Sequence, residues 1–314
     1  MSSRVPSTPG LSRSPVGRSR PSPPVRVGVG VDGHASGRDA VVLASQLARA
    51  SGGELMLIAI YEEPLLEPLV PSEAGWTSGR KQARAMLAAT RDSLAREARI
   101  VVDSNALVWR GLCRVSEREH RDLLVVGSGR RAGDGQVRLG ERARDLLYHL
   151  ECPLAIAPRG MSNRAAPRLE RIGVGFNDGP EARAALELAG SVALEAGAQL
   201  AVRGVIDEHV PGVPILKPGG LEGDAVVSER SKSLLQRTLA ASRATGAAVG
   251  VDVTPGGPVD ALLELAAEVD LLIIGSGRSG PANRVCLGKT GSALLDGAPC
   301  PVLIVPRPTN DSSL

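Results

Sequence analysis

An internal duplication constrains the fold of this chain more than any other feature of its sequence. Residues 127–159 and 275–307 align without a gap at a constant spacing of 148 residues, and both begin Gly-Ser-Gly-Arg and carry Cys-Pro before a final apolar run. The front parts also align, since residues 26–30 overlay residues 171–175. Solenoid repeats are far shorter, about 20–50 residues, so the duplication predicts two globular domains in tandem.

Within each copy, short apolar runs alternate with segments rich in Ala and Leu. Strands are expected in the first copy near 25–31, 55–61, 100–108, 123–126 and 154–157, and in the second near 171–176, 200–206, 247–253, 271–274 and 302–305. Helices of the first copy are expected at 38–50, 80–98, after Gly111 and at 139–150. Runs this apolar do not suit an exposed face, so the pattern predicts an α/β fold with two doubly wound, five-stranded parallel sheets.

The first 24 residues differ in composition from the rest of the chain. They are mostly Ser, Pro, Arg and Gly, which leaves little to bury, and a disordered tail is expected. The domains are expected at residues 25–159 and 171–307, joined by a linker at 160–170 and followed by a C-terminal tail at 308–314.

Charge and aromatic content argue against a dedicated nucleic-acid binder. The net charge of +3 falls to −1 when the four arginines of the tail are set aside, so the folded body lacks a basic footprint. Trp, Tyr and Phe together number five in 314 residues, which leaves few rings on which bases could stack. We therefore expect no specific nucleic-acid partner.

Other classes of protein lose support in the same way. No apolar run approaches the roughly 18 residues of a membrane span, and no apolar signal segment follows the arginines of the tail. The four cysteines include no C-x-x-C pair, which argues against zinc and dithiol chemistry. A cytoplasmic protein without a membrane partner is expected.

A glycine-rich loop follows the fourth strand of each copy: GSGRRAGDGQVRLGER at 127–142 and GSGRSGPANRVCLGKT at 275–290. Ligands of open parallel sheets bind beyond the carboxyl ends of the strands, and glycines let backbone amides approach an anion. The turn after the first strand carries Asp32 in one copy and Asn177 in the other. Such a side chain can contact a ribose or phosphate of a ligand, or it can simply cap the next helix, and both interpretations stay open.

The order of these motifs resembles the universal stress protein family over about residues 25–307. The first copy reads VGVDG, LMLIAIYE, DLLVVGSGRRAG, LGERARDLL and CPLAIAP, and the second reads IGVGFNDGPEA, LLIIGSGRSG, LGKTGSALL and CPVLIVP. The resemblance implies strand order 3-2-1-4-5 in each domain and pairing of the domains through their last strands. In one subclass of the family it also implies ATP bound at a G-x2-G-x9-G-[ST] loop.

Both loops depart from that ATP pattern. An arginine replaces the second glycine in each, and Glu141 takes the Ser/Thr place in the first copy, where a carboxylate repels phosphate. We therefore expect ATP or another adenine nucleotide, with or without Mg²⁺, to bind weakly and better in the second domain. The resemblance implies contacts from Asn177, Val205, Gly275, Arg278, Gly288, Lys289 and Thr290 in the second domain, and from Asp32, Ile60, Gly127, Arg130 and Gly140 in the first.

No catalytic set can be assembled from the repeated positions. Gly288-Lys289-Thr290 is not a P-loop, because Asn283 stands where that motif requires glycine. We expect a non-enzymatic stress-response protein that acts through assembly or an unknown protein partner. The alternatives are a ligand-free module that works as a homodimer, and, less favoured, a slow ATP hydrolase, for which the second loop offers no carboxylate or base.

Overall fold

The computed structural model describes residues 25–62, 73–164, 168–206, 221–277 and 281–309. The expected N-terminal tail and residues 310–314 of the expected C-terminal tail lie outside the described residues. The strands of the first half are β1 (Val27–Gly30), β2 (Leu55–Tyr61), β3 (Arg99–Ser104), β4 (Leu123–Gly127) and β5 (Leu154–Ala157). Those of the second half are β6 (Arg171–Phe176), β7 (Gln199–Ile206), β8 (Val249–Pro255), β9 (Leu271–Gly275) and β10 (Val302–Val305).

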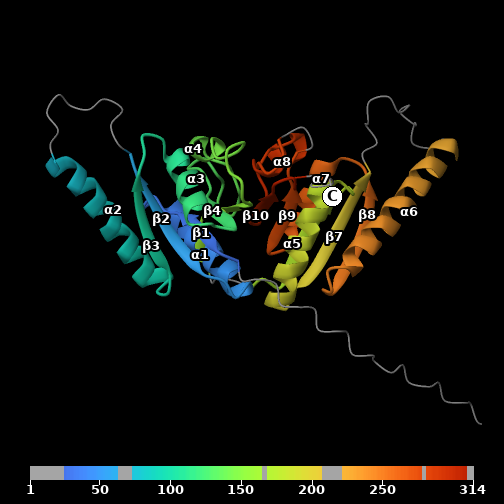
Figure 1. Cartoon of the computed structure of the whole chain (residues 1–314). Helices are drawn as coiled ribbons and strands as arrows, with labels where there is room; N and C mark the ends of the chain where they lie inside the picture. Colours follow the sequence, from blue (N-terminus) through green and yellow to red (C-terminus); the bar gives the residue numbers. More distant parts are fainter. Residues whose placement is uncertain (1–24, 63–72, 165–167, 207–220, 278–280, 310–314) are drawn as a thin grey trace, which may run out of the picture.

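These ten strands form one continuous sheet in the order β3-β2-β1-β4-β5-β10-β9-β6-β7-β8 (Figure 1). Each half has the predicted order 3-2-1-4-5, and every pair within a half is parallel. The halves join through one antiparallel pair, in which Ala155 of β5 lies opposite Leu303 of β10. The predicted fold class and the pairing of the last strands are therefore confirmed.

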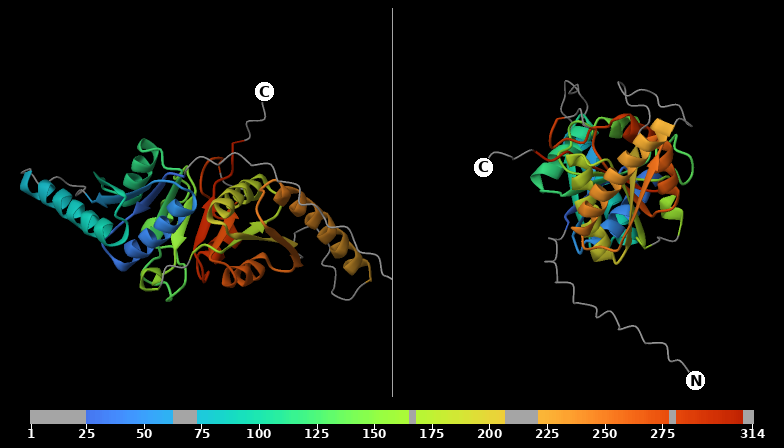
Figure 2. Two further views of the ribbon diagram at one scale, coloured as in Figure 1. Left: turned by 90° about the horizontal axis from the view of Figure 1, so that it is seen from below. Right: turned by 90° about the vertical axis from the view of Figure 1, so that its right-hand side faces the viewer.

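Helices cover both faces of this sheet (Figure 2). One face carries α1 (Ala35–Ala50), α2 (Glu73–Leu94), α5 (Pro180–Ala196) and α6 (Leu221–Arg243), and the other carries α3 (Val108–Arg118), α4 (Glu141–Arg144), α7 (Pro258–Ala267) and α8 (Lys289–Leu294). Alternate strand residues supply the two cores: Leu123 and Val125 of β4 face the α1 layer, and Leu124 and Val126 face the α3 layer. Burial on both faces explains why the strands read as unbroken apolar runs.

Several predicted elements were wrong in extent: the helix expected at 80–98 is α2, which ends at Leu94, and the helix expected after Gly111 begins at Val108. The helix expected at 139–150 is reduced to α4, because the chain beyond it turns away: Tyr148 adopts φ of 71° and its N–H donates to the carbonyl of Val285 in the other half at 2.7 Å. The third strand ends at Ser104 rather than at 108, since α3 begins at Val108. A long-range contact accompanies the shortening of the 139–150 helix, and the start of α3 sets the end of the third strand.

The connection between the halves is tied to α1. It contains a short 3-10 helix at Met161–Asn163, inside the predicted linker. The carboxylate of Asp39, fully buried in α1, accepts hydrogen bonds from the N–H groups of Gly160 at 2.9 Å and Ser162 at 2.7 Å. Helices α1 and α5 also contact each other across the joint. Of the helices that the structure describes, none has the length and apolarity to cross a membrane.

Candidate functional site

The loop after β4 is closed by its own backbone and by one serine. Gly129 N–H donates to the carbonyl of Arg138 at 2.7 Å. The buried hydroxyl of Ser128 donates to the carbonyl of Ala157 at 2.7 Å and accepts from the N–H of Arg138 at 3.2 Å. The loop therefore folds back against the end of β5.

The loop after β9 repeats this construction. Gly277 N–H donates to the carbonyl of Cys286 at 2.8 Å, and Ser276 Oγ accepts from the N–H of Cys286 at 3.2 Å. The same hydroxyl lies 3.4 Å from the carbonyl of Arg284. Arg278, a predicted phosphate contact, lies outside the described residues.

Glycines at the strand ends are required by packing alone. A Cβ atom on Gly127 would lie 2.0 Å from the carbonyl oxygen of Ser36 at the start of α1. A Cβ atom on Gly275 would lie 2.6 Å from the carbonyl oxygen of Glu181 in α5. Both distances are far inside van der Waals contact, so each helix start can approach its strand only because the residue there is glycine.

The later glycines of the loops face each other. A Cβ atom on Gly129 would lie 2.8 Å from Cα of Gly140, and one on Gly277 would lie 2.6 Å from the nitrogen of Gly288. Backbone therefore packs directly on backbone at the neck of each loop. The N–H of Gly129 and that of Gly277 are used within the loops themselves and are not open to a phosphate.

Asp32 and Asn177 make the same local turn. Asp32 Oδ1 accepts from the N–H of His34, and Asn177 Oδ1 accepts from the N–H of Gly179, both at 3.0 Å. The predicted helix cap is wrong, because the N-cap residues are His34 and Gly179; each side chain instead bonds the backbone two residues on, in a local turn. Their contact with a ribose stays a prediction.

Several charged side chains of the first loop have polar partners. The guanidinium of Arg130 lies 3.2 Å from Nε2 of His34. The backbone carbonyl of Arg130 accepts a hydrogen bond from the guanidinium of Arg159 at 2.9 Å. Glu141 forms an exposed ion pair with Arg131 at 3.6 Å. His34 has no counterpart histidine in the other half.

The second loop leaves its predicted residues more open. Gly288 and Lys289 are exposed, Thr290 is half-buried, and the first turn of α8 contains no acidic residue. By contrast, α4 begins with Glu141. The two predicted adenine contacts also differ. Ile60 packs against Gly111 of α3, and a Cβ atom added to this glycine would lie 2.6 Å from Cγ2 of Ile60. Val205 is half-buried on β7.

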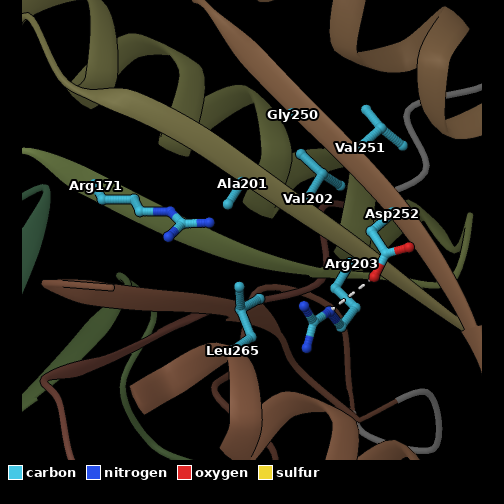
Figure 3. Close-up of a pocket in the computed structure, with 8 residues that line it drawn as sticks. All are labelled: Arg171, Ala201, Val202, Arg203, Gly250, Val251, Asp252 and Leu265. Carbon is cyan, nitrogen blue, oxygen red and sulfur yellow. Dashed lines mark ion pairs between the residues drawn. The ribbon is translucent and has the colours of Figure 1, made fainter. Parts of the chain in front are cut away.

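Two hollows lie away from the paired glycines of the loops, which are called the glycine necks below (Gly129 with Gly140, and Gly277 with Gly288). One, of about 190 Å³, sits on the sheet beside α7, where Arg203 pairs with Asp252 at 3.4 Å and Leu265 forms a wall (Figure 3). The other, of about 300 Å³, lies between α3, His149 of the first half and Arg284 of the second. In the first hollow Arg203 already has acidic partners, which leaves little free charge for a ligand.

The cysteines behave as buried apolar side chains. Burial raises the pKa of Cys152 and of Cys300 to about 12, and that of Cys113 to about 11. All of these are free thiols, and at neutral pH they stay protonated. Within the described ranges, no three His, Cys, Asp or Glu side chains are grouped to hold a metal ion.

Comparison with known proteins places this architecture among relatives. The profile of the universal stress protein family matches residues 25–158 and again 168–306. A universal stress protein of Mycobacterium tuberculosis is 29% identical over 205 residues, covering 62% of this chain and 68% of that protein. Another from the same species is 25% identical over 184 residues, covering 58% of this chain, so the match spans 61% of that relative's length.

A solved structure has the same architecture. The universal stress protein of Archaeoglobus fulgidus aligns with 90% of this chain and 98% of its own length, with a TM-score of 0.64 and 17% identity. At that identity the likeness concerns the fold. Both halves of the present chain therefore correspond to repeats of one known domain.

Proposed function

The chain belongs to the universal stress protein family, and from that premise we propose that it is a non-enzymatic stress-response protein that binds an adenine nucleotide weakly at the loop after β9. The observation that carries the proposal is the exposed cation of Lys289 at the start of α8, with no acidic residue in that first turn. A lysine ammonium attracts phosphate as a point charge. The corresponding Glu141 in the first half has the opposite sign.

Weak binding is expected because the loop departs from the ATP pattern, with Arg278 in the place of the second glycine. Among the described residues of this loop, Lys289 supplies a cation and Thr290 a hydroxyl for the phosphates. We expect an affinity near the millimolar range, which corresponds to about −4 kcal/mol. Mg²⁺ would enter with the nucleotide, since these residues supply no carboxylate to hold it. A cytoplasmic location stays a prediction from the sequence.

Calorimetric titration of the full chain with ATP and Mg²⁺ tests this function. We expect saturable heat at millimolar ATP, a loss of that heat in Lys289→Glu, and little change in Glu141→Lys. Equal effects of the two substitutions would contradict the ranking of the loops. A parallel assay of phosphate release tests the absence of catalysis, and turnover above the buffer rate would make the protein an ATPase.

A second candidate function has its own structural support. The glycine-rich loops themselves help to hold the halves together: Val137 N–H donates to the carbonyl of Ala298 at 2.8 Å, and Val285 N–H donates to that of Leu150 at 3.2 Å. Loops built for this joint would need no nucleotide. The protein would then act as a ligand-free module through a homodimer or another protein partner. Absence of heat with ATP together with a dimer by light scattering would favour this function.

A further inference from the structure

We propose that the hollow between α3 and the second half is a binding site for small flat aromatic anions, such as aromatic carboxylates. It has a volume of about 300 Å³, the lower end of the range of small-molecule sites. It is distinct from the glycine necks, and the proposal does not depend on nucleotide binding.

The wall of this hollow is aromatic. The Trp109 indole in the first turn of α3 and the His149 imidazole lie with their ring centroids 4.3 Å apart at an angle of 39°. The thiol of Cys113, one turn further along α3 and almost wholly buried, lines the hollow as well. A flat ring finds two aromatic side chains and a polarisable sulfur there, which are favourable contacts for an aromatic ligand.

One cation at the hollow is free to meet an anion. The guanidinium of Arg284 forms an ion pair with Glu151 at 2.7 Å, and that of Arg114 pairs with Asp103 at 3.0 Å. Arg110 is exposed, lies 5.1 Å from the centroid of the Trp109 ring, and has no carboxylate partner among the described residues. A carboxylate on the ligand would supply that partner in a charge-assisted hydrogen bond.

The opposite end of the hollow is acidic. Glu117 lines it seven residues beyond Arg110 on the same helix, a rise of about 10 Å. That length suits one substituted ring reaching from the guanidinium toward the carboxylate. An amino or hydroxyl group opposite the ligand carboxylate would therefore strengthen binding.

The chemistry of the hollow exists in one copy of the repeat only. At a spacing of 148 residues, the corresponding positions in the second half carry neither a ring nor a charge; they are Gly257, Pro258, Ala261, Leu262, Leu265 and Gly297. In α7 the aligned Ala261, Leu262 and Leu265 are buried against the sheet, whereas Arg114 and Glu117 of α3 are exposed. The polar and aromatic lining is thus specific to the first half and to its contact with Arg284.

Fluorescence of Trp109 in the full chain tests the site, with Trp76→Phe as the background so that one indole reports. We expect 4-aminobenzoate and benzoate to change the emission saturably, the former at lower concentration. Benzamide, which lacks the charge, and acetate, which lacks the ring, should give no saturable change at the same concentrations. Saturation by benzamide at the same concentration as benzoate would overturn the proposal.

Two variants locate the binding. Arg110→Gln should weaken benzoate binding at least tenfold, whereas Arg118→Gln, on the same helix but paired with Asp103 and outside the hollow, should leave it unchanged. Far-ultraviolet circular dichroism checks that both variants fold. Lys289→Glu separates this proposal from the nucleotide site, because it should weaken ATP binding alone. Unchanged benzoate affinity in Arg110→Gln, or a loss in Lys289→Glu, would overturn the site.

Discussion

Helices α3 and α7 hold corresponding places in the two halves but sit differently on the sheet. Helix α3 packs on β2 and the edge strand β3, whereas α7 packs on β7 and the inner strands β6 and β9. The glycines show the reason. A Cβ atom on Gly28 would meet the side chain of Arg121 at 3.1 Å, but one on Gly173 would meet Leu265 and Val269 at 3.1 Å.

This difference shows how a few side chains can move a helix on an unchanged sheet. In the second half Leu265 reaches the inner strand from α7 itself, and the outer strand β8 is left with the hollow of Figure 3. In the first half the aliphatic part of Arg121, whose side chain is 4% exposed, fills the inner position. Helix α3 then covers the edge strand, where Arg118 pairs with Asp103 at 3.1 Å. The positions of the hollows therefore depend on where α3 and α7 lie on the sheet rather than on the strand order.

Among substitutions that compare the two halves, Gly127→Ala should lower the stability of the protein most. The added methyl group would press on the backbone of α1, so we expect a loss of about 3 kcal/mol in the free energy of unfolding. Gly275→Ala should cost somewhat less, because its contact is longer. Urea denaturation without nucleotide measures both losses.

Gly297→Ala is the matched control, since nothing lies within 4 Å of the added atom. We expect its stability to equal or slightly exceed that of the wild type. If Gly127→Ala were as stable as this control, the glycine at the end of β4 would have to be explained by a ligand rather than by packing.

Asp39→Ala should have the next largest effect. The buried carboxylate accepts two backbone hydrogen bonds from the connection between the halves, and the aligned position in the second half is Ala184. Leaving these donors unpaired should cost about 2 kcal/mol. Asp39→Asn keeps one acceptor oxygen and should cost less. Thermal unfolding ranks the variants, and equal stability of Asp39→Ala and wild type would mean that the connection does not need this tie.

Exchanging residues between the halves sharpens the comparison of α3 with α7. Arg121→Val alone should cost about 1 kcal/mol, since it uncovers Gly28 and leaves Glu54 without its partner at 2.8 Å. Glu117→Leu with Arg121→Val copies the second half and should recover most of that loss. A double-mutant cycle in urea measures the coupling. Strict additivity would show that helix placement is set elsewhere.

The smallest effect concerns Asp122 and pH. Burial favours a raised pKa for Asp122, but hydrogen bonds from the side chain and backbone of Arg26 outweigh it and hold the pKa below its usual value. A depressed carboxyl pKa stabilises the fold above the unfolded value of about 3.9, and this contribution is lost as pH falls through the folded pKa.

Asp122→Asn should therefore lower stability at pH 7 by less than about 1 kcal/mol, because the pair is partly exposed. The difference from wild type should shrink between pH 5 and 3. Denaturation at several pH values measures it, and a constant difference down to pH 2 would exclude the ion pair as its source.

Much of the fold could be predicted because each core strand is a short apolar run buried on both faces. The runs 55–61, 154–157, 171–176 and 302–305 coincide with β2, β5, β6 and β10. The end of the helix predicted at 139–150 could not be found locally, since Tyr148 bonds Val285 from the other half. Pattern periodicity contains no information about a partner 137 residues away.

The candidate site was predictable only in part. The glycines of the loops were visible as repeats, but their packing against Ser36 and Glu181 depends on helix approach, which spacing does not encode. Trp109 and His149 were missed because they have no counterparts in the other copy. That lack of symmetry was itself the available signal, since residues that depart from a duplication are free to acquire a separate role.

The antiparallel pair of β5 and β10 makes the contact between the halves independent of protein concentration. Since both strands belong to one polypeptide, opening this seam is a unimolecular event, and the tether keeps each half at an effective concentration in the millimolar range. Dilution therefore cannot part the halves. A regulator that separates the halves would have to compete with an intramolecular contact between tethered strands.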